Sequence, residues 1–559
     1  MVHIKKQWKK LTGLILSFII VVSFAGCGNK DEQVNNAGNI TGAATTEGAA
    51  GESGTKEKIV NIGVTDTLQT LNPILMNGGE VNRYSTSLMF LPLVELGPDL
   101  TFQPMLADSI TTEDNIHFEV HIYEDATWSD GTPITSEDVL FTALRIASPV
   151  VANPNMMYYA FEGVGDDGFV EEGATEISGI QALDEKTVQF TTKYPMALTT
   201  FENTYAAYLL TLPKHVLENV PEADISTYEW FNHPDVVSGP YIVSDFDVNH
   251  YISFEKNKDY WKAEPKIDKL NIKIVEGSQL YAGLKSGEID FVQQTTGVIP
   301  QEDYANVEAL DNVTSVYGSA VTNQSVFIQT QNEAVADVRV RQAILYAIDR
   351  NQLVSGLLNG KGEVVDGFLS SASPFYDASL VPTEYNPDKA RELLEEAGWD
   401  GSKTLRFYVN SGDTTFVNAA SVIAAQLEAV GIKVEITTVD FATLMEVAGT
   451  KDYDLLAVQY TYAPVDPYPD VNWLLSGADS WTGYSNSKIT DALEVTQTTS
   501  DINTIKSQYL IVDQIVQQDV PMFSAYIISA LGAVNKRLVN ATPTVYGSFS
   551  HVETWDVIE

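Results

Sequence analysis

Hydrophobic and polar residues alternate with two different periods along this chain, and the period changes from segment to segment. Residues 116–123 place four apolar side chains on one side of an extended chain, which is the two-residue period of a half-buried strand. Residues 338–349 repeat their apolar positions every three or four residues, which is the period of a helix. We expect further strands at 59–64, 177–183, 187–192, 240–246 and 250–256, and helices over 80–96, 279–286 and 503–518.

The passage from residue 387 to residue 459 predicts the class of the fold. Pro387 and Gly398 bracket a helix, because proline suits the first helical turn and glycine suits the residue after the last. We expect that a strand at 405–409, a helix at 416–430 and strands at 432–438 and 454–459 follow. Strands and helices in this alternation are typical of a parallel sheet, so we expect a mixed α/β protein.

A different pattern stands at the N-terminus, where a basic segment precedes an apolar run. Residues 1–10 carry four lysines and no acid, residues 11–25 are almost wholly apolar, and Cys27 follows Ala25 and Gly26. This order is typical of a secretory signal, and the apolar run is short for a membrane span. Its end resembles a bacterial lipobox, in which the cysteine is lipidated after the signal has been removed.

We therefore expect residues 1–26 to be a lipoprotein signal peptide and Cys27 to carry the lipid. Residues 28–58 contain mostly small and polar side chains, so they bury too little apolar surface to offset the entropy of ordering. We expect residues 27–58 to be the lipidated cysteine and a flexible tether. The globular body would then lie at the outer face of the cell membrane, outside the cytoplasm.

The body is strongly acidic, which limits its partners. The chain has 75 acidic and 33 basic residues, and loss of the four signal lysines leaves 29 basic residues and a net charge of −46. Nucleic acids bind to basic patches, so we expect no nucleic-acid partner. The charge favours solubility and attracts cationic or amine-bearing solutes weakly.

The motifs of common enzymes and cofactor sites are absent or incomplete. Residues 163–168 fit G-x-G-x-x-G, but no helical pattern follows them. Cys27 is the only cysteine, so the body has no thiolate metal site and no cysteine nucleophile. His117 and His121 lie four apart on an expected strand, without the further ligands of a zinc motif. We expect no cofactor, no metal site and no catalytic residue, although a hydrolase that uses two carboxylates stays open.

Several short blocks occur in a fixed order along the body. They are Trp128-Ser129-Asp130-Gly131-Thr132-Pro133, Ser238-Gly239-Pro240-Tyr241, Asn257-Lys258-Asp259-Tyr260-Trp261, Gly287-Glu288-Ile289-Asp290, Val340 to Arg350 and Lys389 to Gly398. The ordered set resembles the solute-binding protein family 5 of ABC importers, which includes oligopeptide-, dipeptide- and nickel-binding lipoproteins. The resemblance covers residues 59–559, with Ile110 where the family usually has tryptophan.

The resemblance implies an α/β, two-lobed fold like that of periplasmic binding proteins, with an extra subdomain in the first lobe (the cluster C type). Lobe I would comprise residues 59–95, 226–325 and 524–559, the extra subdomain residues 96–225, and lobe II residues 326–523. The resemblance also implies a monomer that closes over its solute by a hinge motion. Its partners would be ABC permease subunits with cytoplasmic ATPases.

The segment from Tyr460 to Asp470 is the main candidate for ligand contact, because it combines aromatic residues, prolines and two acids after a strand. In peptide-binding relatives, an aspartate in a comparable loop pairs with the α-amino group of the ligand. Asp466 matches that place best, and Asp470 is the second choice. A carboxylate in a dry cleft binds an ammonium group strongly. The alternative for Asp466 is a turn-capping role beside proline.

Other candidate ligand contacts follow from the same resemblance. Two backbone segments would flank the ligand, Asn82-Arg83-Tyr84 and Tyr462-Ala463-Pro464. Pro464 has no N–H to donate, so a backbone ladder would be incomplete there. Arg83 would bind a carboxylate or pair with a neighbouring acid. Three further aromatic residues would line a pocket or pack in the core: Trp473, Trp481 and Tyr484.

These observations favour a peptide as the solute and leave two alternatives. Pro464 and the aromatic residues leave room for an oligosaccharide receptor of the same family. A surface hydrolase, or a peptide sensor that does not pass its solute on, is the other alternative. Nickel and haem are less favoured, because the segments expected at the cleft contain no cluster of histidines.

Overall fold

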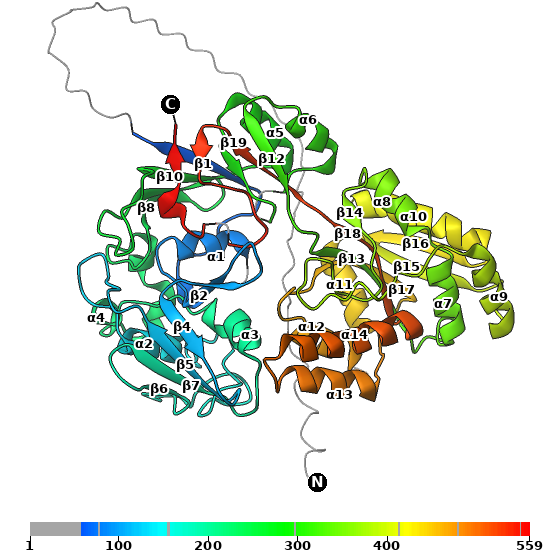
Figure 1. Ribbon diagram of the computed structural model, residues 1–559, viewed down its shortest axis with the longest axis horizontal. Helices are drawn as coiled ribbons and strands as arrows, with labels where there is room; N and C mark the ends of the chain where they lie inside the picture. The colour runs from blue at the N-terminus through cyan, green and yellow to red at the C-terminus, as the bar shows by residue number, and fades with distance from the viewer. Residues whose placement is uncertain are drawn as a thin grey trace, which may run out of the picture.

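The computed structural model describes residues 57–75, 79–153, 157–295, 298–411, 414–477, 480–547 and 549–558. The expected signal peptide, Cys27 and most of the tether lie outside the described residues. The described chain forms two bodies that lie side by side, each built on its own large β-sheet (Figure 1). This is the expected two-lobed α/β fold.

Lobe I is built on a seven-stranded sheet whose strands come from three separate parts of the chain. Their order is β12 (Val313–Tyr317), β19 (Leu531–Asn535), β11 (Phe291–Val292), β1 (Ile59–Val64), β10 (Lys269–Ile274), β9 (Tyr251–Lys256) and β8 (Tyr241–Asp247). Strand β1 pairs in parallel with β10 and β11, and the other neighbours are antiparallel. The lobe also contains helices α1 (Glu80–Ser87), α5 (Gly277–Ser286) and α6 (Tyr304–Glu308).

The extra subdomain has a four-stranded antiparallel sheet in the order β4 (Ala107–Thr111), β5 (His117–Ile122), β7 (Thr187–Thr191) and β6 (Ile180–Ala182). Around it lie β2 (Val94–Leu96), β3 (Phe102–Pro104), α2 (Ser136–Ile146), α3 (Leu198–Phe201) and α4 (Lys214–Leu217). A π-helical turn over Glu202–Ala206 continues α3. The buried apolar residues of the subdomain and of the lobe I sheet form one continuous cluster, so the two parts make one body.

Lobe II is built on a six-stranded sheet with helices on both faces. The order is β14 (Gly362–Glu363), β18 (Met522–Ile528), β13 (Thr322–Ile328), β17 (Leu455–Thr461), β15 (Thr404–Asn410) and β16 (Lys433–Val439). Its helices are α7 (Val338–Tyr346), α8 (Arg350–Leu357), α9 (Pro387–Ala397), α10 (Thr414–Ala429), α11 (Phe441–Thr450), α12 (Tyr468–Leu475), α13 (Ser487–Thr496) and α14 (Ile502–Asp519). Val326 and Ile328 belong to the apolar cluster on one face, and Phe327 belongs to the cluster on the other face.

Two neighbouring passages join the sheets of the two lobes. The chain leaves lobe I through residues 318–321, between β12 and β13, and returns through residues 529–530, between β18 and β19. The passages touch, because the N–H of Gly318 donates to the carbonyl of Ala530 at 2.9 Å. The boundaries expected at 325/326 and 523/524 fall inside strands β13 and β18.

The expected helix over residues 80–96 is wrong beyond Ser87, where α1 ends. The carbonyl of Leu88 accepts a hydrogen bond from the N–H of Tyr241, and the carbonyl of Met89 accepts one from Ser238. These tertiary bonds hold the chain in a different direction. Pro92 then has no N–H with which to continue a helix.

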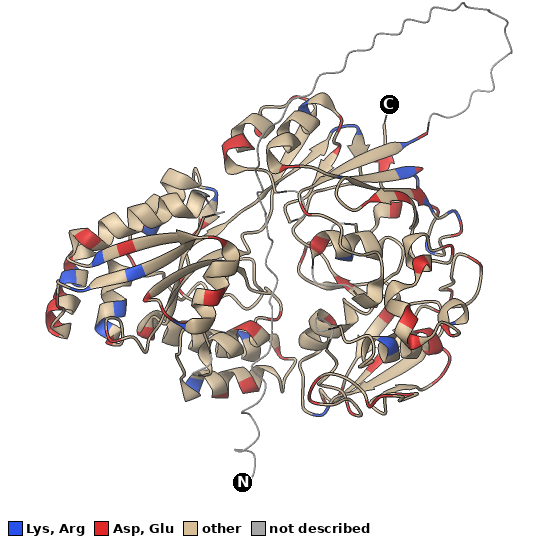
Figure 2. Cartoon of the chain, turned by 180° about the vertical axis from the view of Figure 1, so that it is seen from behind, with Lys and Arg blue, Asp and Glu red and all other residues tan. Residues whose placement is uncertain are grey.

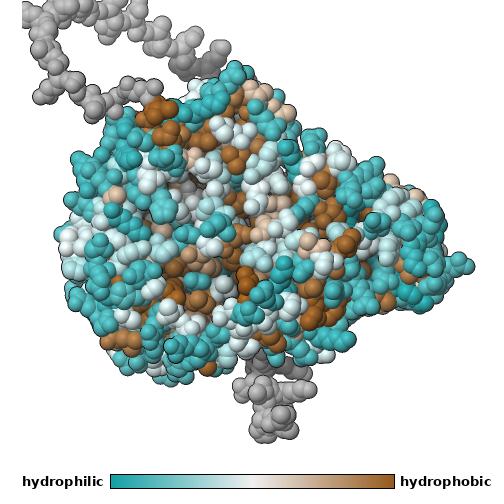
Figure 3. Space-filling view, in the orientation of Figure 1, coloured by the Kyte–Doolittle hydropathy of each residue, from teal (hydrophilic) through white to brown (hydrophobic). Residues whose placement is uncertain are grey.

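Charge and hydropathy are distributed differently over the surface. Figure 2 shows acidic residues over both lobes and few basic residues, in keeping with the net charge of −42. Figure 3 shows hydrophobic and neutral residues along the middle of one face, where the lobes meet, and hydrophilic residues around the edge. The strip where the lobes meet is therefore less polar than the outer surface.

Candidate functional site between the lobes

The loop between β17 and α12 lies at the boundary between lobe II and the extra subdomain (Figure 1). Pro464 and Pro467 restrict its backbone, and the N–H of Asp466 closes a turn onto the carbonyl of Ala463 at 3.3 Å. The hydroxyl of Ser373 donates to the carbonyl of Pro464 at 2.6 Å. The loop is thus held from both sides, and it presents the Asp466 side chain towards the other body.

Asp466 contacts the extra subdomain directly. The hydroxyl of Thr200, on α3, lies 2.9 Å from Oδ1 of Asp466 and 3.3 Å from Oε1 of Gln497. Asp466 is only 3% exposed, and its Oδ2 has no hydrogen-bond partner among the described residues. A buried carboxylate oxygen without a partner costs free energy, so this atom is available to a ligand that can donate a hydrogen bond.

The pKa values of the two acids in this segment also indicate that the site lacks a positive charge. Burial raises the pKa of Asp466 to about 7; the nearby charge of Asp470 adds to this rise, while the side chains of Thr200 and Asn203 oppose it. Burial raises the pKa of Asp470 to about 6, while a hydrogen bond from the Tyr460 hydroxyl at 2.7 Å opposes the rise. Within the described part of the chain, no basic side chain affects either carboxyl. A bound cation would relieve both carboxylates.

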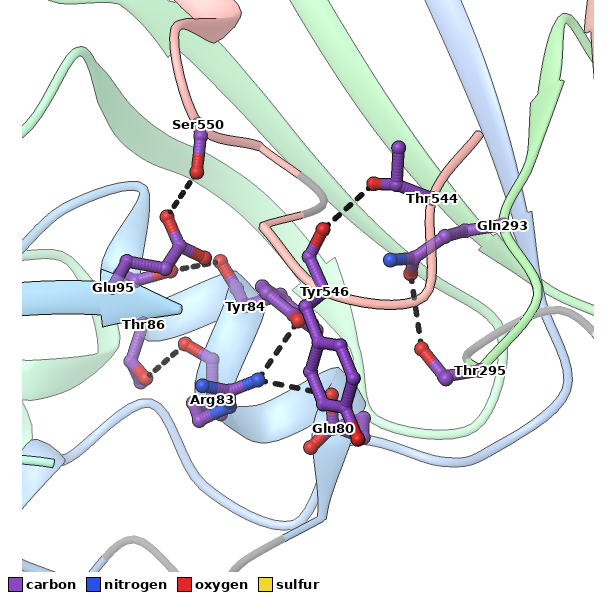
Figure 4. Close-up of polar contacts among 11 residues, drawn as sticks. Glu80, Arg83, Tyr84, Thr86, Glu95, Gln293, Thr295, Thr544, Tyr546 and Ser550 are labelled. Carbon is purple, nitrogen blue, oxygen red and sulfur yellow. Dashed lines mark hydrogen bonds and ion pairs between the residues drawn. The ribbon is translucent and has the colours of Figure 1, made fainter. Parts of the chain in front are cut away.

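Asn82, Arg83 and Tyr84 lie in α1 of lobe I. Figure 4 shows the bonds of Arg83 to Glu80 and Tyr84. Oδ1 of Asn82 accepts from the N–H of Gln69 at 2.7 Å. Nη2 of Arg83 donates to Oε2 of Glu80 at 3.1 Å and to the Tyr84 hydroxyl at 2.8 Å. The charge of Arg83 is therefore already balanced, although its buried Nε has no partner among the described residues.

Tyr462 and Ala463, predicted at the ligand, lie in the same loop as Asp466. The ring of Tyr462 lies 4.7 Å from that of Tyr460, between centroids, and Tyr462 is 4% exposed. The Tyr462 hydroxyl lies 3.5 Å from the Ser325 hydroxyl and donates to Sδ of Met522 at 3.5 Å. Tyr462 therefore packs under the loop, while Ala463 holds Asp466 by its carbonyl.

The three aromatic residues that follow the loop do not gather around Asp466. The rings of Trp473 and Trp481 lie 5.0 Å apart, edge to face, and Trp481 packs on Phe327 in the core beneath the sheet. The hydroxyl of Tyr484 donates to the carboxylate of Asp519. Whether any of the three contacts a ligand stays a prediction.

The sequence model of "Bacterial extracellular solute-binding proteins, family 5 Middle" matches residues 101–482, which is more than half of the chain. The chain belongs to this family. The match begins in the extra subdomain and ends in lobe II, and it includes Thr200 and Asp466.

Curated relatives of this family 5 protein share about a quarter of its residues. The oligopeptide-binding protein AppA of Bacillus subtilis is 26% identical over 462 residues, which cover 79% of this chain and 81% of AppA. The glutathione-binding protein GsiB of Shigella dysenteriae is 24% identical and covers 86% of this chain and 91% of its own length. The nickel-binding periplasmic protein of Escherichia coli is 25% identical over 59% of each chain.

Solved structures share the fold of this family 5 protein. The substrate-binding protein CtaP of Listeria monocytogenes matches 90% of this chain and 100% of its own, with a TM-score of 0.78 and 23% identity. AppA of Bacillus subtilis in complex with a nonapeptide matches with a TM-score of 0.69 and 23% identity, again over 90% and 100%. These likenesses establish the two-lobed architecture.

Thr200, Gln497 and Glu202 were missed by the sequence analysis of this family 5 protein. Glu202 lies in the π-helical turn after α3, and burial raises its pKa to about 7. Thr200 lies 266 residues before Asp466 in the chain, so no local pattern links the two. The only local signal was the polar character of Thr199 and Thr200 in an otherwise apolar stretch.

The described residues offer neither a metal site nor a membrane-spanning helix. Among them, no group of three histidine, cysteine, aspartate or glutamate side chains is arranged to hold a metal ion. No helix among the same residues is both long enough and apolar enough to cross a membrane.

Proposed function

We propose that this chain is the extracytoplasmic, lipid-anchored receptor of an ABC importer, which captures peptides between its lobes and delivers them to the permease. Membership of family 5 supports a solute-binding role. The relatives named for peptides support a peptide as the solute, as do the structures of AppA with a nonapeptide and of DppA from Helicobacter pylori with the peptide STSA.

The observation that carries this proposal is the unpartnered Oδ2 of buried Asp466, on a lobe II loop that contacts the extra subdomain. In our proposal, the α-amino group of the peptide donates to this oxygen when the lobes close. The ammonium would neutralise a carboxylate that has no basic partner in the described chain. Charge-assisted bonds of this kind are about twice as strong as neutral ones, and they fix the direction of the peptide.

Isothermal titration of the full-length protein in detergent with short peptides tests this role. We expect N-acetylation of the peptide to weaken binding about tenfold or more, and Asp466→Asn to weaken the free peptide equally. Acetylation should then have no further effect on the variant, because both changes remove one interaction. Asp388→Asn, at a 93% exposed side chain on α9, is the control of equal charge change and should bind normally.

An oligosaccharide receptor is the second candidate, and exposed tyrosines beside the site favour it. Tyr159 is 46% exposed and Tyr194 is 45% exposed, both in the extra subdomain. Asp466 is close enough to affect the pKa of Tyr159 and of Tyr468 on α12. Aromatic faces of this kind stack on sugar rings. Binding of oligosaccharides with no binding of any peptide would favour this candidate.

The lipid anchor and the absence of catalysis need separate tests, because neither follows from the fold. We expect Cys27→Ala to release the protein from the membrane fraction and to abolish labelling with a radioactive fatty acid. We expect peptides to be recovered intact after long incubation with the protein. Cleavage that disappears in a variant of two acidic residues would favour the hydrolase instead. Uptake of a labelled peptide that depends on the permease would separate transport from sensing.

A further inference from the structure

We propose that the ligand carries two positive charges at one end, a free α-amino group and a basic side chain in its first or second residue, which Asp466 and Asp470 bind together. This inference rests on the proposed function, because it assumes that a peptide enters by its amino terminus. It adds a substrate class, namely peptides that begin with lysine or arginine.

The two carboxylates belong to one short segment of the chain. Asp466 precedes α12 and Asp470 lies in the first turn of that helix, so they are four residues apart. They are close enough for the charge of Asp470 to affect Asp466. Both lie at the end of lobe II that meets α3 of the extra subdomain (Figure 1).

Each carboxylate has one oxygen occupied and one oxygen open. Thr200 bonds to Oδ1 of Asp466, and Tyr460 donates to Oδ1 of Asp470. Oδ2 of Asp466 is buried without a partner in the described chain, and no described residue donates a hydrogen bond to Oδ2 of Asp470. The hydroxyl groups hold the carboxylates in place but leave their charges unbalanced.

Charge balance then selects the ligand. One ammonium group compensates one carboxylate, and the second must either stay charged in a dry site or keep a proton. Among the described residues, no basic side chain affects either carboxyl. A ligand with two cationic groups neutralises both carboxylates at once.

The tyrosines beside the pair can accommodate the aliphatic part and the charge of a basic side chain. Tyr159 comes from the extra subdomain and Tyr468 comes from α12, and Asp466 affects both. Aromatic faces attract ammonium and guanidinium groups, most strongly when water is excluded. A basic side chain would bind at Asp470, beside Tyr460, whose hydroxyl donates to that carboxylate at 2.7 Å, while the α-amino group binds at Asp466 near Tyr159 and Tyr468.

The experiment compares three tetrapeptides of equal length by titration of the full-length protein in detergent at pH 7.5. They carry lysine, norleucine or glutamate at the first position and alanine elsewhere. We expect the lysine peptide to bind about tenfold tighter than the norleucine peptide, which has a side chain of similar length without the charge. The glutamate peptide should bind most weakly. Equal affinity for lysine and norleucine would overturn the inference.

Variants assign the preference to Asp470. In Asp470→Asn we expect the preference for lysine over norleucine to disappear, while N-acetylation still weakens both peptides. Asp470→Glu should restore part of the preference, which a purely structural role would not do. An unchanged thermal midpoint for Asp470→Asn confirms that the variant is folded. A preference that survives in Asp470→Asn would overturn the assignment.

A control peptide with lysine at another position distinguishes binding by Asp466 and Asp470 from attraction by the acidic surface as a whole. A tetrapeptide with lysine only at its last position should gain nothing over norleucine there. An equal gain at either end would point to long-range attraction by the net charge and would overturn the inference. Loss of the lysine preference with a retained effect of N-acetylation would leave the proposed function intact. No effect of N-acetylation on any peptide would contradict the proposed function itself.

Discussion

Lobe II contains two buried acidic regions that differ in one respect. In the first, Asp366 pairs with Arg350 at 2.5 Å, and the two side chains are 1% and 2% exposed. Arg350 also donates to the carbonyls of Val365, Ser524 and Thr383. In the second, Asp466 is equally buried, but only the hydroxyl of Thr200 and the amide of Asn203 act on it, and no cation does.

The difference appears in the pKa values. Burial disfavours the charge of Asp366, yet Arg350 and hydrogen bonds from Thr383 and Gln517 hold its pKa below the ordinary value. For Asp466 burial dominates, and the pKa rises to about 7. Burial alone therefore does not identify a functional acid. The structure completes the first region before any ligand arrives, whereas the second region lacks a positive charge.

The largest expected effect on stability is at the ion pair of Arg350 and Asp366. Arg350→Met leaves the carboxylate of Asp366 buried without its cation, so we expect the free energy of unfolding to fall by about 3–5 kcal/mol. Denaturant titration followed by circular dichroism measures this loss. The double variant Arg350→Met/Asp366→Leu should lose less, because no charge is stranded. An Arg350→Met protein as stable as the parent would remove the basis of the comparison.

An intermediate effect is expected at Arg83, which lies in lobe I and pairs with Glu80 of the same helix. Its guanidinium lies 4.4 Å from the Tyr84 ring centroid and 5.6 Å from that of Tyr208. Arg83→Met removes the ion pair and these contacts, so we expect a loss of about 1–3 kcal/mol in the free energy of unfolding. If Arg83 instead binds the ligand carboxylate, peptide binding would fall without a change in stability.

The third prediction concerns how the stability of the protein depends on pH through Asp466. Because Asp466 keeps its proton to a higher pH in the folded state than in the unfolded state, the ligand-free protein should lose stability as pH rises from about 4 to about 7. Asp466→Asn should make stability depend less on pH, by an amount that corresponds to the uptake of up to one proton. Thermal midpoints at half-unit pH steps measure it. A cationic ligand needs the ionised carboxylate, so peptide affinity should rise with pH over the upper part of this range.

The smallest expected effect is at Thr200. Thr200→Val removes the hydroxyl from Asp466 and Gln497 at nearly constant volume, so we expect stability to change by about 1 kcal/mol or less. Peptide affinity should fall several-fold, because Asp466 loses the group that positions it. Titration of Thr200→Val beside Thr200→Ser, which keeps the hydroxyl, separates this role from packing. Equal weakening in both variants would contradict it.

Local chemistry in the sequence explains much of the fold. The strand at 59–64 is confirmed as β1, and Gly287 and Gly398 end α5 and α9 in the left-handed conformation at φ of 77° and 68°. Thr135 begins α2 in a capping box with Asp138. Each of these features depends on residues a few positions apart, which a single sequence contains.

Features that depend on distant segments could not be predicted in the same way. The helix expected over 80–96 stops early because residues 238–241 bind the carbonyls of Leu88 and Met89. The prolines and acids of the loop after β17 marked it as a candidate site, yet nothing in that loop indicated Thr200 as its partner. For Arg83 the sequence left two alternatives open, a ligand carboxylate or a neighbouring acid, and the structure shows it paired with Glu80, three residues earlier.

The two passages between the lobes form one connection. They connect β12 and β19 of lobe I to β13 and β18 of lobe II, and they are tied by the bond from Gly318 to Ala530. A Cβ on Gly318 would lie 2.6 Å from Cγ2 of Val545, so this point is packed firmly against lobe I. Two adjacent passages tied to each other restrain the lobes more than a single passage would. In the proposed binding mode, an ammonium group at Asp466, which contacts Thr200 of the extra subdomain, would join the two bodies at a second point, away from these passages.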